Sequence, residues 1–88
     1  MHFSKVAISY HRNGICGNGF HVVRFGWYDA DEKAHRTMVA TVFAEPGNCA
    51  VLDLDETARG NIAFAKGNSW RGDEFEPTLR ELIAAWQQ

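Results

Sequence analysis

Four Gly-Asn dipeptides divide this chain into short segments, and they constrain its fold more than any other feature of the sequence. They lie at residues 17–18, 47–48, 60–61 and 67–68. Glycine and asparagine tolerate the backbone angles that turns require, so each dipeptide predicts a turn or a loop. The runs between them are rich in β-branched and aromatic residues, which favour strands. The chain is therefore expected to contain a series of short strands joined by turns.

Alternation of apolar and polar residues indicates where these strands lie. Residues 3–10 alternate in this way, which is the pattern of a half-buried strand. Residues 20–28 and 37–43 carry apolar side chains on both parities, as strands in the middle of a sheet do. A fourth strand is expected over residues 49–54 and a short fifth strand over residues 62–65. No helix pattern separates the first strands, so they are predicted to form an antiparallel meander.

The end of the sequence has helical periodicity instead. Its apolar residues form one stripe at helical spacing, made of Phe75, Leu79, Leu82, Ile83 and Trp86. Pro77 is expected at the first helical position, where its missing N–H costs nothing. The predicted fold is therefore α+β, an antiparallel β-meander of about five strands with one C-terminal amphipathic helix packed on one face. Residues 1–88 are expected to form a single domain.

The composition is that of an ordinary folded globular protein, because 45% of the residues are hydrophobic and 23% are charged. A formal net charge of −2 gives no general attraction to nucleic acid. No apolar run has the pattern of a signal peptide or a membrane span, and two cysteines are too few for a disulfide framework. We therefore expect a cytoplasmic protein that contacts no membrane and carries no cofactor.

The apolar strands predict a partner. Ten helical residues form a rod about 15 Å long, whereas five strands form a sheet about 24 Å wide, so the helix covers roughly a third of one face. A second copy of the same sheet would cover the rest most simply, which predicts a homodimer. The alternative is a monomer whose sheet curls tightly enough to bury its own apolar residues. The argument for a dimer fails if a single chain completely buries all six of the residues Val22, Val23, Phe25, Trp27, Val39 and Phe43.

Two polar loops, residues 11–21 and 66–73, are the candidate contact surfaces. The second combines tryptophan, arginine and amide groups, which often anchor recognition surfaces. The leading interpretation is a small non-catalytic binding or assembly module that contacts a protein partner through these loops. In the alternative interpretation of the second loop, Trp70 closes over the core and Arg71 pairs with a nearby carboxylate. The candidate binding residues are His11, Arg12, Asn18, His21, Asn68, Trp70, Arg71 and Asp73.

A second candidate function is binding of single-stranded nucleic acid. Four strands followed by a C-terminal helix resemble the architecture of the PC4-like coactivators and related single-strand binders. The resemblance implies a dimer that uses basic and aromatic side chains of its sheet. The side chains that would form such a stripe here are Lys5, Arg12, Arg24 and Arg36, beside Trp27 and Tyr28.

Residues 51–57, Val-Leu-Asp-Leu-Asp-Glu-Thr, resemble the signature of haloacid-dehalogenase-type phosphatases. The resemblance implies a nucleophilic Asp53, an Asp55 that transfers protons, and a bound Mg²⁺. That family's fold requires a central parallel strand with helical crossovers, which the pattern of the first three strands contradicts. In the alternative interpretation, Asp53 faces solvent at a strand end and Asp55 caps a turn.

His11, Cys16 and His21 are spaced five residues apart around the first loop. Together with Cys49 or His35 they could complete a tetrahedral zinc site, although no closely spaced ligand pair is present. Cys16 could also act as a nucleophile activated by His21. The simpler interpretation of His21 is a strand residue that contacts its cross-strand neighbours. A small metal- or thiol-dependent enzyme is therefore the third candidate, less expected than a binding module.

Overall fold

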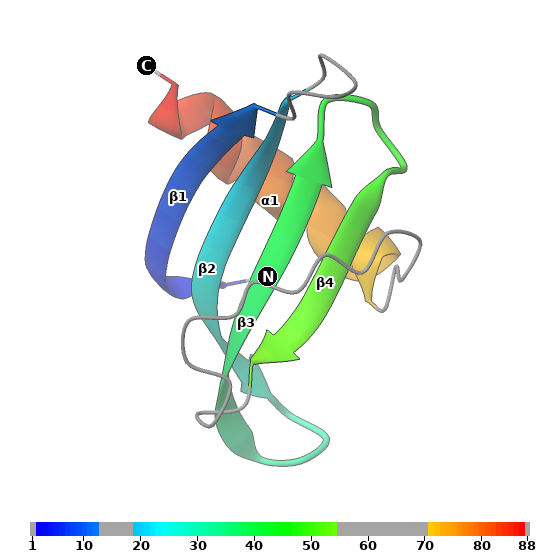
Figure 1. The fold of residues 1–88 in the computed structure, drawn as a ribbon. Helices are drawn as coiled ribbons and strands as arrows, with labels where there is room; N and C mark the ends of the chain where they lie inside the picture. Colours follow the sequence, from blue (N-terminus) through cyan, green and yellow to red (C-terminus); the bar gives the residue numbers. More distant parts are fainter. Residues whose placement is uncertain (1, 13–18, 55–70, 88) are drawn as a thin grey trace.

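The computed structural model describes residues 2–12, 19–54 and 71–87, which form one antiparallel sheet with one helix packed against it (Figure 1). The strands are β1 (Ser4–Arg12), β2 (Gly19–Asp29), β3 (Ala34–Phe43) and β4 (Cys49–Leu54), and the helix is α1 (Gly72–Trp86). The order in the sheet is β1-β2-β3-β4, so each strand pairs with its neighbour in the chain. The predicted α+β class is confirmed. The described residues contain four strands, and the expected fifth, residues 62–65, lies outside them.

The first hairpin is longer than the alternation of side chains predicted. β1 pairs with β2 as far as Arg12 and Gly19, so residues 11–12 and 19–21 of the expected loop belong to strands, and residues 13–18 lie outside the described residues. Backbone groups, not apolar side chains, make the hydrogen bonds of a ladder, so polar residues such as His11 can continue a strand. The same reason extends β3 back to Ala34, three residues before the strand that was expected over residues 37–43.

Strand parity divides the sheet into two faces. Tyr10 of β1 pairs with His21 of β2. His21 also pairs with Val42 of β3, which in turn pairs with Cys49 of β4. Residues paired in this way point to the same side of a sheet, so these side chains lie in one row. We call their side, which α1 covers, the helix face, and the opposite side the second face.

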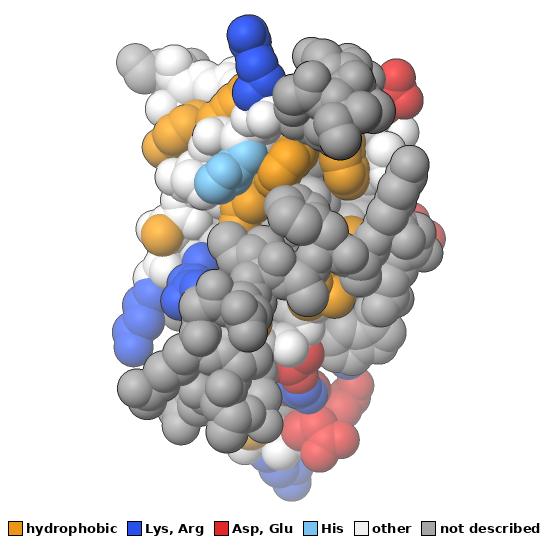
Figure 2. Space-filling model, in the orientation of Figure 1, with side chains coloured by type: hydrophobic (Ala, Val, Ile, Leu, Met, Phe, Trp, Pro, Cys, Tyr) orange, Lys and Arg blue, Asp and Glu red, His pale blue; other side chains and the backbone are white. Residues whose placement is uncertain are grey.

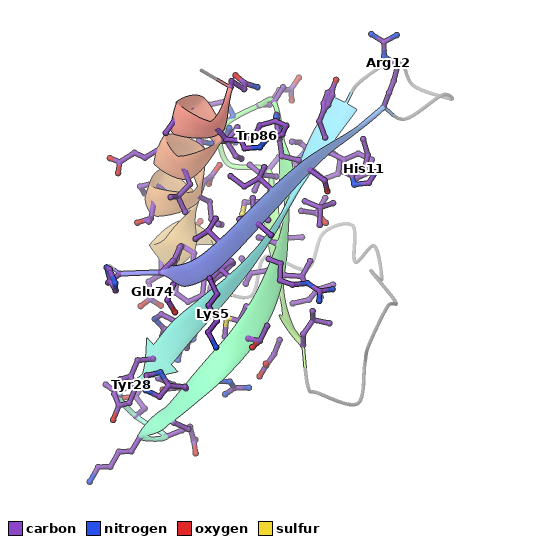
Figure 3. The ribbon with its side chains drawn as sticks, turned by 90° about the vertical axis from the view of Figure 1, so that its left-hand side faces the viewer. Lys5, His11, Arg12, Tyr28, Glu74 and Trp86 are labelled. Carbon is purple, nitrogen blue, oxygen red and sulfur yellow. The ribbon has the colours of Figure 1, made fainter. Side chains whose placement is uncertain are left out.

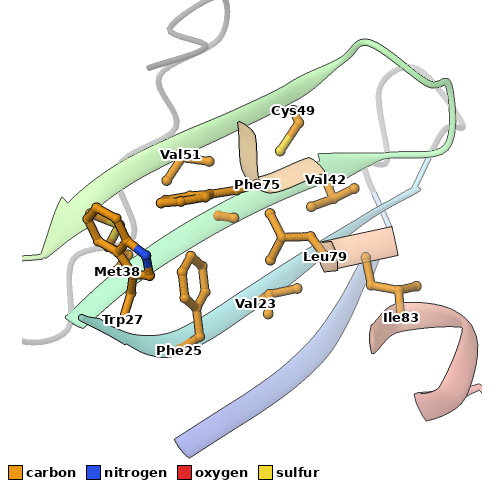
Figure 4. Packing of buried hydrophobic residues seen from close by; sticks show 11 residues of the cluster. Val23, Phe25, Trp27, Met38, Val42, Cys49, Val51, Phe75, Leu79 and Ile83 are labelled. Atoms are coloured by element: carbon orange, nitrogen blue, oxygen red, sulfur yellow. The ribbon is translucent and has the colours of Figure 1, made fainter. Parts of the chain in front are cut away.

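The core lies between the helix face and α1 (Figure 4). Phe75 of α1 is fully buried, and its ring centre lies 5.0 Å from that of Trp27 and 5.8 Å from that of Phe25. Both contacts have the edge-to-face geometry that aromatic rings favour. The buried residues of this cluster are Val23, Phe25, Trp27, Met38, Ala40, Val42, Cys49, Val51, Phe75, Leu79 and Ile83.

The helix starts earlier than the sequence suggested. It begins at Gly72, so the prediction that Pro77 takes the first helical position is wrong. Pro77 removes one hydrogen bond from the helix interior, the one to the carbonyl of Asp73. The turn before it still forms, because Phe75 is buried in the core and its N–H donates to the carbonyl of Arg71 at 3.0 Å. Burial of one side chain thus extends the helix past a residue that usually starts one.

The second face bears on the expected dimer. Of the six apolar residues that test the dimer argument, five are buried in the single chain and Phe43 is partly buried. Val22 and Val39, which lie on the second face, are only 5% and 1% exposed. Figure 2 looks onto this face and shows hydrophobic side chains gathered over the upper half of the sheet. One chain thus buries five of the six residues, which weakens the area argument for a second copy, and the homodimer itself stays a prediction.

Candidate functional site

The candidate binding residues that the structure describes do not come together at one place. Asn18, Asn68 and Trp70 lie outside the described residues. The other candidates are divided between two ends of the sheet. His11, Arg12 and His21 lie where β1 ends and β2 begins, whereas Arg71 and Asp73 lie at the start of α1. Arg71 contacts Trp27, which is six residues beyond His21 along β2, or about 20 Å at the rise of a strand.

Arg71 is engaged within the fold. Its guanidinium lies over the ring of Trp27, and its nitrogens lie 3.9 Å from an oxygen of Asp31 and 3.7 Å from one of Glu74. This arrangement agrees with the alternative interpretation of the second loop, in which Arg71 pairs with nearby carboxylates. Asp73 is exposed in the first turn of α1. In the described part of residues 66–73, Arg71 therefore has a structural role, because it connects the start of α1 to Trp27 and to nearby carboxylates.

The two histidines of the proposed zinc site point to opposite sides of the sheet. His21 lies on the helix face, whereas the His11 ring stacks on Phe20 on the second face, with ring centres 5.4 Å apart. Figure 3 shows His11 on the side of the sheet away from α1. Cys16 lies outside the described residues. Within residues 2–12, 19–54 and 71–87 there is no cluster of three or more possible metal ligands. The pairing of β1 with β2 therefore separates His11 from His21.

Cys49 is buried on the helix face. Burial, and to a smaller extent the charge of Glu76, raise the pKa of its thiol to about 11, and Arg80 opposes the shift. A thiol with such a pKa is almost entirely protonated at neutral pH, and the protonated form is a poor nucleophile and metal ligand. Cys49 is therefore a core residue.

Asp53 forms an ion pair with Arg36, which also lies 3.3 Å from a carboxylate oxygen of Asp29. Burial disfavours the charged form of Asp29, but hydrogen bonds from the backbone of Glu32 and Asp31 and from Arg36 hold its pKa below the usual value. The strand that carries Asp53 is antiparallel to its neighbour. Asp53 therefore lacks the central parallel strand that the phosphatase family requires, and Asp55 lies outside the described residues.

The basic and aromatic stripe expected for nucleic-acid binding is split between the two faces. Arg24 and Tyr28 share the second face, whereas Trp27 and Arg36 share the helix face. Trp27 is 8% exposed and lies beneath Arg71. A single strand stacked on Tyr28 therefore does not reach Trp27.

A different site emerges at the end of the sheet where β2 begins and α1 ends. Two of the three exposed large hydrophobic residues in the described ranges, Tyr10 and Trp86, lie here, each 47% exposed. Both rings contact His21 edge to face, with centres 5.1 Å and 5.9 Å from its ring. Figure 3 shows Trp86 at this end of α1, on the side that faces the sheet. The Tyr10 ring passes over Gly19, where a Cβ atom would collide with its hydroxyl.

A shallow groove of about 240 Å³ lies beside these rings. We call this groove, together with Tyr10 and Trp86, the aromatic groove. It is smaller than typical ligand pockets of roughly 300–1,000 Å³, so it has room for a side chain and not for a cofactor. Its lining residues are His21, Val42, Ala44, Arg80, Ile83, Ala84 and Gln87.

Hydrogen bonds hold the polar residues of the aromatic groove in place. Arg80 donates to a carboxylate oxygen of Glu76 at 2.9 and 2.7 Å and to the carbonyl of Glu45 at 2.7 Å. The Gln87 amide nitrogen lies 3.1 Å from Nε2 of His21. Burial lowers the pKa of His21 below its ordinary value, which favours the neutral form of its ring.

Sequence reasoning found His21 but not the groove. Trp86 belongs to the apolar stripe and was expected to be buried, yet it lies at the end of α1, where the sheet no longer covers it. The available signal was its position as the last residue of the stripe. Tyr10, which contacts the same histidine as Trp86, was predicted only to lie in the first strand.

Comparisons of the chain with protein-family models, with curated proteins and with solved structures find no match. No helix within the described ranges is both long enough and apolar enough to cross a membrane. A functional assignment for this chain therefore depends on its own residues and their geometry.

Proposed function

We propose that this protein is a non-catalytic binding module that holds a partner polypeptide at the aromatic groove. The observation that carries the proposal is the convergence of Tyr10 and Trp86, which come from opposite ends of the chain, on the same histidine while staying half exposed. Exposed tryptophan and tyrosine rings are the side chains that most often anchor protein interfaces. Two such rings beside a groove form an anchor point for a partner's side chain.

The framework around the groove supports recognition because it is rigid. Tyr10 and His21 lie on paired strands, and Trp86 ends a helix whose residues Leu79 and Ile83 are buried in the core. Rings already held in position lose little conformational freedom on binding, which favours affinity. The tether between Gln87 and His21 joins the end of α1 to the sheet at the same point.

The chemistry of the groove favours binding over catalysis. His21 lies beside the amide of Gln87, whereas a histidine that acts as a general base is usually oriented by a carboxylate. Arg80 is held by Glu76 and by the Glu45 carbonyl. The nearest strand thiol along the same row, Cys49, is protonated at neutral pH.

This proposal moves the contact surface away from the two predicted loops, with His21 as the residue common to both. The proposal does not include a homodimer, because Val22 and Val39 are buried in the single chain. The proposal does not include single-strand binding either, because strand parity divides the expected basic and aromatic stripe between the two faces of the sheet. The binding unit is thus one chain with one aromatic groove.

Selection of peptides from a displayed random library on the folded protein tests the proposal. The selected peptides are measured on Trp86→Ala and on Tyr28→Ala, a matched control because Tyr28 is 50% exposed and contacts a histidine, His35, away from any part of the groove. Loss of an interface anchor costs about 2 kcal/mol, so we expect affinity to fall about 30-fold in the first variant and to stay unchanged in the second. The proposal fails if no peptide is selected, or if the selected peptides bind Trp86→Ala as tightly as the wild type. Circular dichroism confirms that both variants are folded.

A further inference from the structure

The exposed rings of the aromatic groove have a preference for charge. The face of an aromatic ring carries negative electrostatic potential, so it attracts cations, and tryptophan does so most strongly. Trp86 and Tyr10 are each 47% exposed, and both rings contact His21, which lines the groove. Their contacts with His21 are edge to face, which leaves ring surface of both residues accessible to a ligand.

The end of α1 adds to this preference. A helix C-terminus carries a partial negative charge from its last carbonyl groups. Basic residues in the last turn often offset that charge, but α1 has none there. Gln87 donates its N–H to the carbonyl groups of Ile83 and Ala85, which satisfies only part of this terminus. The negative pole of α1 therefore ends at the aromatic groove.

The charged side chains near the groove also favour a positively charged ligand. Arg80 is the one cation among the lining residues, and its charge is countered by Glu76 at 2.7 Å. Two further carboxylates are exposed nearby. Glu45 lies in the turn whose carbonyl accepts a hydrogen bond from Arg80, and Glu81 follows Arg80 in α1. Arg12, which pairs with Gly19, is a second cation at this end, so among the described residues the three carboxylates Glu45, Glu76 and Glu81 still outnumber the two cations Arg12 and Arg80.

We infer that the aromatic groove receives a positively charged side chain, lysine or arginine, from the partner polypeptide. The aliphatic part of such a side chain would lie against Val42, Ile83 and Ala84, with its charged group near Trp86 and the end of α1. This inference rests on the proposed function and adds the chemical class of the ligand. The volume of about 240 Å³ fits one such side chain.

The test compares two blocked tripeptides, acetyl-Gly-Lys-Gly-amide and the same peptide with norleucine, which keeps the aliphatic chain and lacks the charge. Each is titrated into the full-length, ¹⁵N-labelled protein at pH 7.5 while the backbone amide signals are followed. We expect the lysine peptide to shift the signals of Tyr10, His21, Trp86 and Gln87 and to bind about two- to fivefold more tightly than the norleucine peptide. Norleucine binding that equals or exceeds lysine binding overturns the inference, as does the absence of shifts at these residues.

A variant that keeps apolar contact separates charge from packing. Trp86→Leu retains a large apolar side chain but removes the aromatic face, so the preference for lysine over norleucine falls toward onefold. Tyr28→Leu is the matched control and leaves the preference unchanged. A preference that survives in Trp86→Leu contradicts the inference.

The two proposals fail in different ways. If displayed peptides bind in a Trp86-dependent manner but the norleucine peptide binds as well as the lysine peptide, the site is apolar and the proposed function stands without the charge preference. If no displayed peptide depends on Trp86, the proposed function itself is wrong.

Discussion

The guanidinium carbon of Arg71 lies 4.4 Å from the centre of the Trp27 ring, and this contact closes the end of the core opposite the aromatic groove. Arg71 reaches this position with a φ angle of 56°, in the left-handed region that favours glycine. Backbone strain at Arg71, directly before α1, is thus maintained by the contact that covers the buried Trp27.

Replacing Arg71 separates these two effects. Arg71→Ala loses the contact with Trp27 and keeps the strain, whereas Arg71→Gly loses the contact and relieves the strain. We expect both variants to be less stable than the wild type, and the glycine variant to be about 1 kcal/mol more stable than the alanine variant. Urea unfolding followed by tryptophan fluorescence measures the difference. An alanine variant at least as stable as the glycine variant would show that the strain is absent.

Gly19 is expected to control the position of Tyr10. A Cβ atom at residue 19 would occupy the place of the Tyr10 hydroxyl, which is the mobile end of a side chain and moves at little cost. Gly19→Ala therefore leaves the fold intact and displaces Tyr10 from the groove. We expect its affinity for groove-binding peptides to fall as far as that of Tyr10→Ala, with no further fall in the double variant. Isothermal titration calorimetry of the three variants tests this, and additive effects would contradict it.

His21 is expected to make stability depend on pH. Burial lowers its pKa in the folded protein below the ordinary value of 6.5, so the unfolded chain binds the proton more readily. The free energy of unfolding therefore falls as the pH is lowered from 6.5 toward the folded pKa. His21→Gln should reduce this fall, whereas His35→Gln, at the other end of the sheet, should leave it in place. Urea unfolding at pH 7.5, 6.5 and 5.5 provides the comparison, and an undiminished fall in His21→Gln would contradict it.

Protonation of His21 is also expected to weaken the binding of a positively charged side chain. The other titratable or charged groups at this end of the molecule are Tyr10 and Arg12 from β1, Glu76, Arg80 and Glu81 from α1, and Glu45 between β3 and β4. Protonation of His21 adds a positive charge beside the ligand, so the affinity for the lysine peptide should fall below pH 6.5 more than that for the norleucine peptide. Titrations at pH 7.5 and 5.5 measure this, and a parallel fall for both peptides would argue against it.

Cys49 should resist alkylation in the folded protein. Its thiol pKa of about 11 leaves about 100-fold less thiolate at pH 8 than an ordinary thiol with a pKa of 9.0 would have, and burial blocks the reagent as well. In a Cys16→Ser background, which leaves one cysteine, iodoacetamide should react at least about 100-fold more slowly than in 6 M guanidinium chloride. Mass spectrometry follows the reaction, and rapid labelling of the folded protein would show that Cys49 is accessible.

A monomer is the expected state in solution. One chain buries Val22 and Val39 without a second copy, so most of the apolar surface that predicted a dimer is covered within the chain. Light scattering at rising protein concentration should give the mass of one chain throughout. A dimer at tens of micromolar would show that another surface drives association, and Trp86→Ala would then test whether that surface is the aromatic groove.

The sequence by itself determined the α+β class, the bounds of β4 and the buried stripe of Phe75, Leu79 and Ile83. These follow from periodicity, because strands alternate every two residues and helices repeat every 3.6 residues whatever they pack against. It could not decide that α1 extends back past Pro77, because that depends on the burial of Phe75.

Only the tertiary structure decided the site. The register of β1 with β2 places Tyr10 beside His21 and turns His11 to the opposite face. The place where α1 crosses the sheet then determines that Leu79 is buried and that Trp86, two turns later, extends beyond the covering strands and meets the same histidine. Such contacts join residues far apart in the chain, and no local pattern encodes them, because they depend on how whole elements pack together.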